Sequence, residues 1–235
     1  MLTLYGHPLL IAAAVIPAAV LLVYVYKADR LEHEPLTLLL PLIFYGIIST
    51  GLALITERIG RSVLPLFARQ GTHEYNAWMC FLVVALSEEG FKYLLLKRKT
   101  WRSPQFNCQF DGVVYAVFVS LGFALWENIG YSLMYGFSTA VVRALTAVPG
   151  HACFGVFMGA WYGFAKRYDL SGQPSASGFC RTLAVLIPVL MHGAYDFTAT
   201  VESGDYWWAF FAFVIGMFAL AFFLVKKLSA DDRYL

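Results

Sequence analysis

The sequence has few charged residues for its length. Asp, Glu, Lys and Arg make up 14% of its 235 residues, whereas a soluble domain carries about 25%. The hydrophobic share is 60%, so a water-soluble globular protein is excluded. The formal net charge of +2 is too small to indicate nucleic-acid binding. We therefore expect an integral membrane protein surrounded by the lipid bilayer.

Several processing and catalytic signals are also missing. The N-terminal residues MLTLYGHP contain no basic residue and no small-residue cleavage site, so we expect the first apolar segment to remain as an anchor. None of the four cysteines forms a C-x-x-C pair, which argues against a disulfide framework or a thiolate metal site. The absence of G-x-S-x-G and H-E-x-x-H excludes the common serine-hydrolase elbow and the common zinc-protease helix.

Long apolar segments dominate what is present. A helix needs about 20 apolar residues to cross the hydrocarbon core. The sequence predicts an all-α, polytopic membrane helix bundle with about seven transmembrane helices in a single domain, 1–235. The expected spans are 9–27, 35–56, 76–97, 112–135, 144–165, 179–200 and 206–225. The least clear segment, 57–75, could be an amphipathic piece at the membrane interface.

Basic residues are unevenly distributed between the two sides of these spans. With the N-terminus outside, twelve of the 17 lysines and arginines fall in inner segments and four in outer segments. Because inner loops are enriched in Lys and Arg, we predict that the N-terminus is outside and the C-terminus inside. Arg143 begins the fifth span on the outer side, and we expect it to extend toward the membrane surface.

The third span, FLVVALSEEGFKYLLL, contains three charges. Glu88, Glu89 and Lys92 together cost about 8–10 kcal/mol on the insertion scale, whereas the apolar residues between Phe81 and Leu96 return about 3–5 kcal/mol. The charges must therefore face other helices or a water-filled cavity. Both glutamates can reach Lys92, because they precede it by four and three residues.

Further polar residues lie inside the fourth, fifth and sixth spans. Glu127 falls in the fourth span, His151 in the fifth, and His192 and Asp196 one helical turn apart in the sixth. Depths estimated from the helical rise of about 1.5 Å per residue allow these residues to meet the third-span charges in the outer half of the membrane. We therefore predict one polar cluster on four helices.

A carboxylate base, histidines and access to water are the parts needed for hydrolysis. One mechanism has Glu88 activate water directly while His192 faces the oxyanion. In the other, His151, His192 and a glutamate, Glu88 or Glu89, hold a zinc ion. The sequence leaves both open. A proton-coupled transporter or channel is the alternative from another class, because carboxylates and histidines also build proton relays.

Four motifs occur in order on separate spans: S-E-E-G-F-K, G-F-A-L-W-E-N-I-G-Y, P-G-H-A and H-G-A-Y-D. Together they resemble the PrsW family of intramembrane proteases, within the superfamily of CAAX prenyl proteases and bacteriocin-processing enzymes. The resemblance covers about residues 80–200, and we place the protease-like core at about 76–200. Glu127 and Asp196 stand where the CAAX branch has histidine and usually asparagine, so the chain leans toward PrsW rather than toward a CAAX-type prenyl-protein protease.

The resemblance implies a membrane-embedded protease in a bacterial cytoplasmic membrane that cleaves a membrane-bound protein substrate, in the PrsW case an anti-sigma factor. By position it assigns the paired glutamates, the following lysine, the fourth-span glutamate, the two histidines and the last carboxylate to the site. These residues are Glu88, Glu89, Lys92, Glu127, His151, His192 and Asp196. Whether zinc is a cofactor is undecided at this point.

Overall fold

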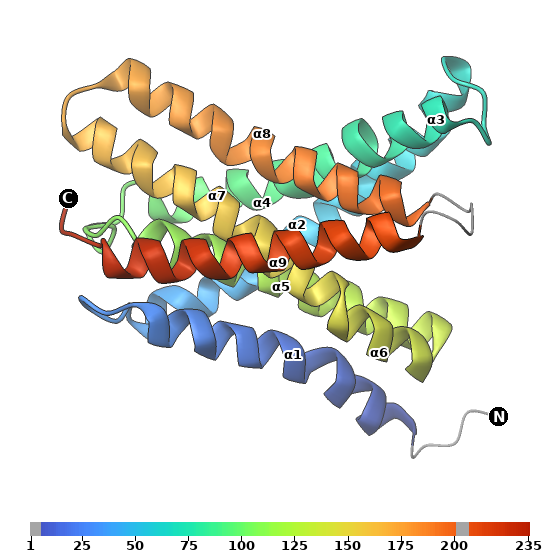
Figure 1. Ribbon diagram of the computed structural model, residues 1–235, viewed down its shortest axis with the longest axis horizontal. Coiled ribbons are helices and arrows are strands. Elements are labelled where there is room, and N and C mark those ends of the chain that lie inside the picture. The colour runs from blue at the N-terminus through green and yellow to red at the C-terminus, as the bar shows by residue number, and fades with distance from the viewer. Residues whose placement is uncertain (1–5, 201–206) are drawn as a thin grey trace.

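The computed structural model describes residues 6–200 and 207–235, and the described chain is almost entirely helical (Figure 1). The α-helices are α1 (Gly6–Ala28), α2 (Leu36–Val63), α3 (His73–Trp78), α4 (Leu86–Thr100), α5 (Asp111–Tyr135), α6 (Phe137–Leu145), α7 (Ala147–Leu170), α8 (Pro174–Ala199) and α9 (Trp207–Ala230). A 3-10 turn, η1 (Leu64–Leu66), follows α2, and a π-helical segment, η2 (Met79–Ala85), joins α3 to α4. Within the described residues these elements form a helix bundle, as predicted.

Helices α5 and α7 form the centre of the bundle. Every residue from Asp111 to Ala124 of α5 is buried, as is every residue from Gly150 to Ala160 of α7. The two backbones approach closely at Gly112, where a Cβ atom would lie 2.7 Å from the Gly159 carbonyl oxygen. Small residues permit such close helix packing in membranes. The remaining long helices surround this pair and leave apolar side chains exposed on the outside.

Six helical stretches are long and apolar enough to cross a membrane: Leu10–Ala28, Leu36–Leu66, Asp111–Tyr135, Phe137–Leu170, Pro174–Ala199 and Trp208–Ala230. These match six of the predicted spans in order. The seventh prediction, 76–97, falls on the helical stretch that runs without a break through α3, η2 and α4. Its low apolarity comes from the charged residues that α4 carries.

Three of the charged residues of α4, namely Glu88, Glu89 and Lys92, point into the bundle. Glu88 is 5% exposed, and Glu89 and Lys92 are fully buried. The structure therefore confirms the expectation, drawn from their insertion cost, that these side chains avoid lipid. The π-helical segment immediately before them holds more residues per turn than an α-helix, which sets the direction in which the side chains of α4 face.

Two local predictions need correction. The fifth span does not begin as one helix at residue 144, because the chain forms α6 and α7 with a break at Thr146. The 57–75 segment is also not one amphipathic piece. Its first half continues α2 to Val63, and η1, a turn and the start of α3 follow.

Candidate active site

The α4 charges form the inner part of a polar network. Lys92 Nζ lies 2.7 Å from Glu89 Oε1 and 3.6 Å from Glu88 Oε2. It also lies 4.0 Å from the centre of the Phe123 ring. Glu89 is thus the close partner of the lysine, while Glu88 Oε2 has no hydrogen-bond partner. The adjacent glutamates stand in different environments although both can reach Lys92.

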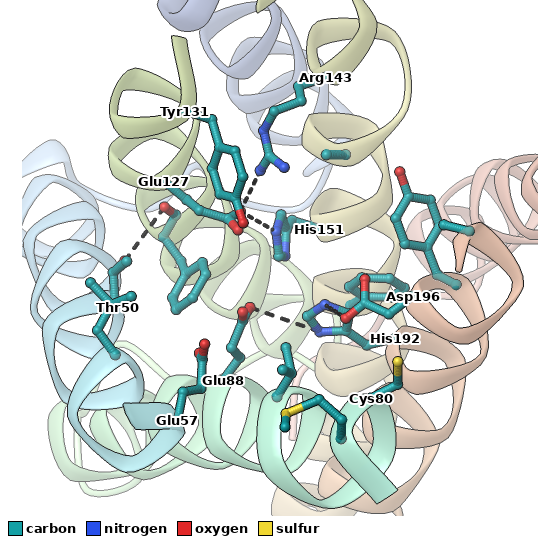
Figure 2. A pocket seen from close by; sticks show the side chains of 18 of the residues that line it. Thr50, Glu57, Cys80, Glu88, Glu127, Tyr131, Arg143, His151, His192 and Asp196 are labelled. Atoms are coloured by element: carbon teal, nitrogen blue, oxygen red, sulfur yellow. Dashed lines mark hydrogen bonds and ion pairs between the residues drawn. The ribbon is translucent and has the colours of Figure 1, made fainter. Parts of the chain in front are cut away.

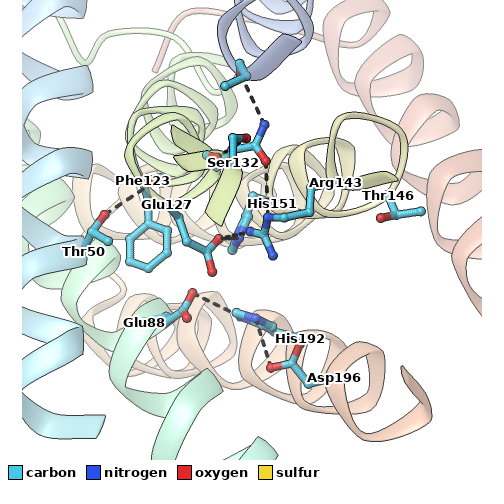
Figure 3. A network of polar contacts seen from close by, with 12 residues as sticks. Thr50, Glu88, Phe123, Glu127, Ser132, Arg143, Thr146, His151, His192 and Asp196 are labelled. Carbon is cyan, nitrogen blue, oxygen red and sulfur yellow. Dashed lines mark hydrogen bonds and ion pairs between the residues drawn. The ribbon is translucent and has the colours of Figure 1, made fainter. Parts of the chain in front are cut away.

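His151 on α7 connects Lys92 to the fourth predicted span. Its Nδ1 lies 3.0 Å from Lys92 Nζ, and its Nε2 lies 3.0 Å from Glu127 Oε2. Because an ammonium group only donates, Nδ1 is the acceptor and the Nε2–H donates to Glu127. Arg143 Nη2 donates to the same Glu127 oxygen at 2.7 Å. Glu127 is therefore held by two donors (Figure 3).

His192 on α8 approaches the network from the opposite side. Its Nδ1 lies 2.9 Å from Glu89 Oε1 and 3.9 Å from Glu88 Oε2. Its Nε2 faces Asp196 Oδ2 at 3.5 Å, one turn further along the helix. The turn of α8 passes close to η2 at Gly193, where any Cβ atom would collide with the Phe81 ring. The glycine of the H-G-A-Y-D motif thus lets His192 come within reach of α4.

A cavity of about 360 Å³ opens beside this network. Glu88, Glu127, His151, His192 and Asp196 line it, and Figure 2 shows their side chains converging from four helices. Glu89 and Lys92 contribute to the network from behind these residues. The structure thus brings all seven predicted site residues into one connected set, with five at the cavity wall.

Sequence reasoning missed several residues of the cavity. Arg143 does not extend to the membrane surface, because it pairs with Glu127 and stacks 4.0 Å from the Tyr131 ring centre. Glu57 and Arg61, from α2, lie 3.7 Å apart at the cavity wall. An acidic residue and a basic residue one turn apart near the end of an apolar helix were the available signal for this pair.

The donor set fits a metal ion. One ligand atom from each of Glu88, Glu89, His151 and His192 lies within 4.8 Å of the others. Each histidine also places one nitrogen against a carboxylate outside that group, Glu127 or Asp196, as in carboxylate–histidine–zinc arrangements. Lys92 opposes this fit, because its ammonium hydrogen-bonds Glu89 Oε1 and His151 Nδ1 and would have to move aside.

A polytopic helix bundle that buries carboxylates and histidines beside a cavity has the residues that an intramembrane hydrolase requires. Comparison with known sequences identifies the protein family. Residues 34–226 match the family described as PrsW family intramembrane metalloprotease. The chain belongs to the PrsW family and is a membrane-embedded protease.

Similar proteins support this assignment over most of the chain. Protease PrsW of Geobacillus kaustophilus is 33% identical over 218 residues, which cover 90% of this chain and 86% of that protein. Protease PrsW of Bacillus subtilis is 30% identical over 221 residues, covering 94% and 95% of the two chains. Protease PrsW of Oceanobacillus iheyensis is 34% identical over 194 residues, covering 80% and 81%. No solved structure matches the chain.

Proposed function

We propose that this protease cleaves a membrane-bound protein such as an anti-sigma factor, with Glu88 as the general base. The observation that carries the proposal is the contrast between the two adjacent glutamates. Each glutamate keeps one buried oxygen without a hydrogen-bond partner, but Glu88 lines the cavity and hydrogen-bonds neither Lys92 nor His192. Glu89 is fully buried behind it, in contact with Lys92 and His192.

In the proposed reaction, Glu88 takes a proton from a water molecule in the cavity as that water attacks the scissile carbonyl carbon. A carboxylate can do this when it is within hydrogen-bond reach of the water. The same carboxyl group then returns the proton to the leaving amine. No covalent enzyme intermediate is needed, which agrees with the absence of a serine nucleophile motif.

Glu89 serves as the fixed counter-ion of Lys92 and as the acceptor for His192 Nδ1–H. The His192 ring is held at both nitrogens, because Nδ1 lies 2.9 Å from Glu89 Oε1 and Nε2 lies 3.5 Å from Asp196 Oδ2. The ring lines the cavity, and as an imidazolium it carries both N–H groups. Its Nε2–H then lies between Asp196 and the cavity and can donate to the developing oxyanion. His151 and Glu127, which Arg143 orients, complete the opposite wall.

Zinc is the alternative electrophile at this site. His151, His192 and Glu88 or Glu89 would hold it, with Glu127 and Asp196 as the outer carboxylates. When bound, zinc polarises a carbonyl oxygen and lowers the pKa of a bound water to about 7. We favour the metal-free version, because Lys92 already provides a positive charge at 2.7 Å from Glu89 and 3.0 Å from His151.

We further propose that the protein lies in a bacterial cytoplasmic membrane with its N-terminus outside and its C-terminus inside. Support comes from the inner excess of Lys and Arg. In this orientation the ends of α1, α4, α7 and α9 that carry Lys27, Lys97, Lys166 and Lys227 face the cytoplasm.

The function is tested with purified protein in detergent and a single-pass anti-sigma factor as the reporter. We expect cleavage by the wild type and by Glu74→Gln, which changes an exposed glutamate on α3. Glu88→Gln should be inactive. If wild-type protein that has been shown to be folded leaves a panel of single-pass reporters uncut, the proposed substrate class is wrong.

A further inference from the structure

A second group of carboxylates, three of them buried, lies at the end of the bundle where α5 begins. Asp29 and Glu34 come from the turn between α1 and α2, Asp111 begins α5, and Asp232 lies beyond the end of α9. Asp29, Glu34 and Asp111 are 1%, 2% and 0% exposed. Figure 1 shows the α1–α2 turn and the C-terminus at the same end of the bundle. We call these four residues the acid corner.

Hydrogen bonds tie the three chain segments of the acid corner together. Glu32 Oε1, in the α1–α2 turn, accepts from Asn107 Nδ2 at 2.7 Å. The Leu235 amide donates to the Asn107 carbonyl at 2.7 Å. Asp232 Oδ1 accepts from the Phe110 amide at 2.8 Å. Segments that are distant in the sequence therefore meet here through specific contacts.

The acid corner contains buried acceptors without donors. The Glu34 carboxylate lies against the Tyr115 hydroxyl and the Asp111 carboxyl without a well-formed hydrogen bond to either. Both carboxylate oxygens of Asp29 lack a hydrogen-bond partner altogether. The same holds for one side-chain oxygen each of Asp111, Asp232, Asn107 and Gln109. Among the described residues, the ion pairs that form involve none of the four acids. Buried acceptors left in this state are costly unless a positive charge or a proton accompanies them.

The side chains of this corner also face one another. Glu34 faces Asp111 and the Tyr115 hydroxyl. Burial, together with the carboxylates of Glu34, Asp232 and Glu32, raises the pKa of Asp29 to about 7. Burial likewise raises the pKa of Glu34 to about 7. Ionised carboxylates therefore repel one another here, and a cation between them would relieve that repulsion.

We propose that the acid corner binds a hard divalent cation, magnesium or calcium. The candidate ligand atoms are all oxygens: the carboxylates of the acid corner and the unpartnered side-chain amide oxygens of Asn107 and Gln109. Oxygen ligands are those that these ions select. Among the described residues, ligand atoms gather within 4.8 Å of one another at Glu88, Glu89, His151 and His192 and not at this corner. Magnesium keeps several of its waters and is held through one or two carboxylates, so it does not require a close set of protein ligand atoms.

The bound cation would link the α1–α2 turn, the loop before α5 and the C-terminal tail. The central helix α5 begins at this corner with Asp111 and carries Glu127 further along. The ion would thus fix the starting point of the helix that holds one wall of the cavity. This role is separate from catalysis, and it is tested without measuring proteolysis.

The test uses the full chain in detergent, freed of divalent ions with EDTA and dialysed. Thermal unfolding is followed with added MgCl₂ or CaCl₂ at pH 8 and at pH 5.5, and NaCl of equal ionic strength is the control. Because the folded-state pKa values are raised, the protonated acids stabilise the fold at low pH and this contribution is lost as the pH rises through about 7. We expect a saturable increase in Tm on adding the divalent ion at pH 8, and little change at pH 5.5.

The double variant Asp29→Asn, Glu34→Gln keeps the side-chain shapes and removes two charges. It should fold and lose the Tm response to the divalent ion, while Asp169→Asn, an exposed acid on α7, should retain it. The ion should also slow amide hydrogen exchange at residues 29–34 and 231–235 in wild-type protein. A response that persists in the double variant would place the ion elsewhere. The wild type could show no change in Tm on adding the divalent ion while the double variant has a higher Tm than the wild type. That result would show that the acid corner holds protons and not a cation.

Discussion

Glu88→Gln and Glu89→Gln should fail in different ways, although the two residues are adjacent in the sequence. Glu88 Oε2 lies 3.6 Å from Lys92 Nζ and makes no hydrogen bond. Replacing this carboxylate with an amide of the same shape removes little stabilisation. It removes the proposed base, and general-base catalysis contributes about 10²–10⁴-fold. We therefore expect a folded protein whose cleavage rate falls by about that factor.

Glu89→Gln removes a negative charge that both Lys92 and His192 contact. Glu89 Oε1 accepts from Lys92 at 2.7 Å and faces His192 Nδ1 at 2.9 Å. Lys92 is fully buried, and breaking a buried ion pair by neutralising one partner costs about 3–5 kcal/mol. At about 2–4 °C per kcal/mol for a chain of this size, the Tm should fall by about 6–20 °C.

The assay compares Tm in detergent with single-turnover cleavage of the reporter for both variants and for Glu74→Gln. The general-base role is refuted if Glu88→Gln cleaves at close to the wild-type rate. The assignment of Glu89 to Lys92 is refuted if both variants keep the wild-type Tm, or if both lose it equally. If Glu88→Gln loses stability while Glu89→Gln keeps the wild-type Tm and is inactive, the two roles are exchanged.

Three further predictions concern metal, the cavity wall and orientation. Elemental analysis of pure active protein should find well under one zinc per chain, and about one zinc, with activity lost to a chelator and restored by zinc, would reject the metal-free mechanism. Arg143→Gln should lower the cleavage rate at least about tenfold, equivalent to about 1.4 kcal/mol, because Glu127 loses the Arg143 Nη2 donor at 2.7 Å. Arg143→Lys should recover part of the lost rate, and Arg69→Gln, which changes an exposed arginine, should have no effect. Equal cleavage rates for all three variants would show that Arg143 does not act on the site. In intact cells, with Cys108 and Cys180 replaced, a cysteine added after Leu235 should be protected from an impermeant thiol reagent and one added before Leu2 should react; the reverse labelling would invert the proposed orientation.

The sequence by itself determined the membrane setting, the positions of the apolar helices and the direction of the α4 charges. These features follow from transfer free energies, which depend on the composition of each segment and little on its neighbours. A helix that carries Glu88, Glu89 and Lys92 must turn them inward wherever it lies in the bundle. The candidate site residues could be named for the same reason, because intramembrane acids and histidines are costly to place in lipid.

Only the tertiary structure decided which partners these residues meet. Adjacent residues lie about 100° apart around a helix, and in the packed bundle Glu88 lines the cavity while Glu89 lies behind it against Lys92 and His192. Arg143 reaches Glu127 because the chain reverses between α5 and α6 at Gly136, where φ is 88°. The acid corner depends on contacts between segments near residues 29, 107 and 232. Such pairings depend on the rotation and register of packed helices relative to one another, which no single segment of the sequence specifies.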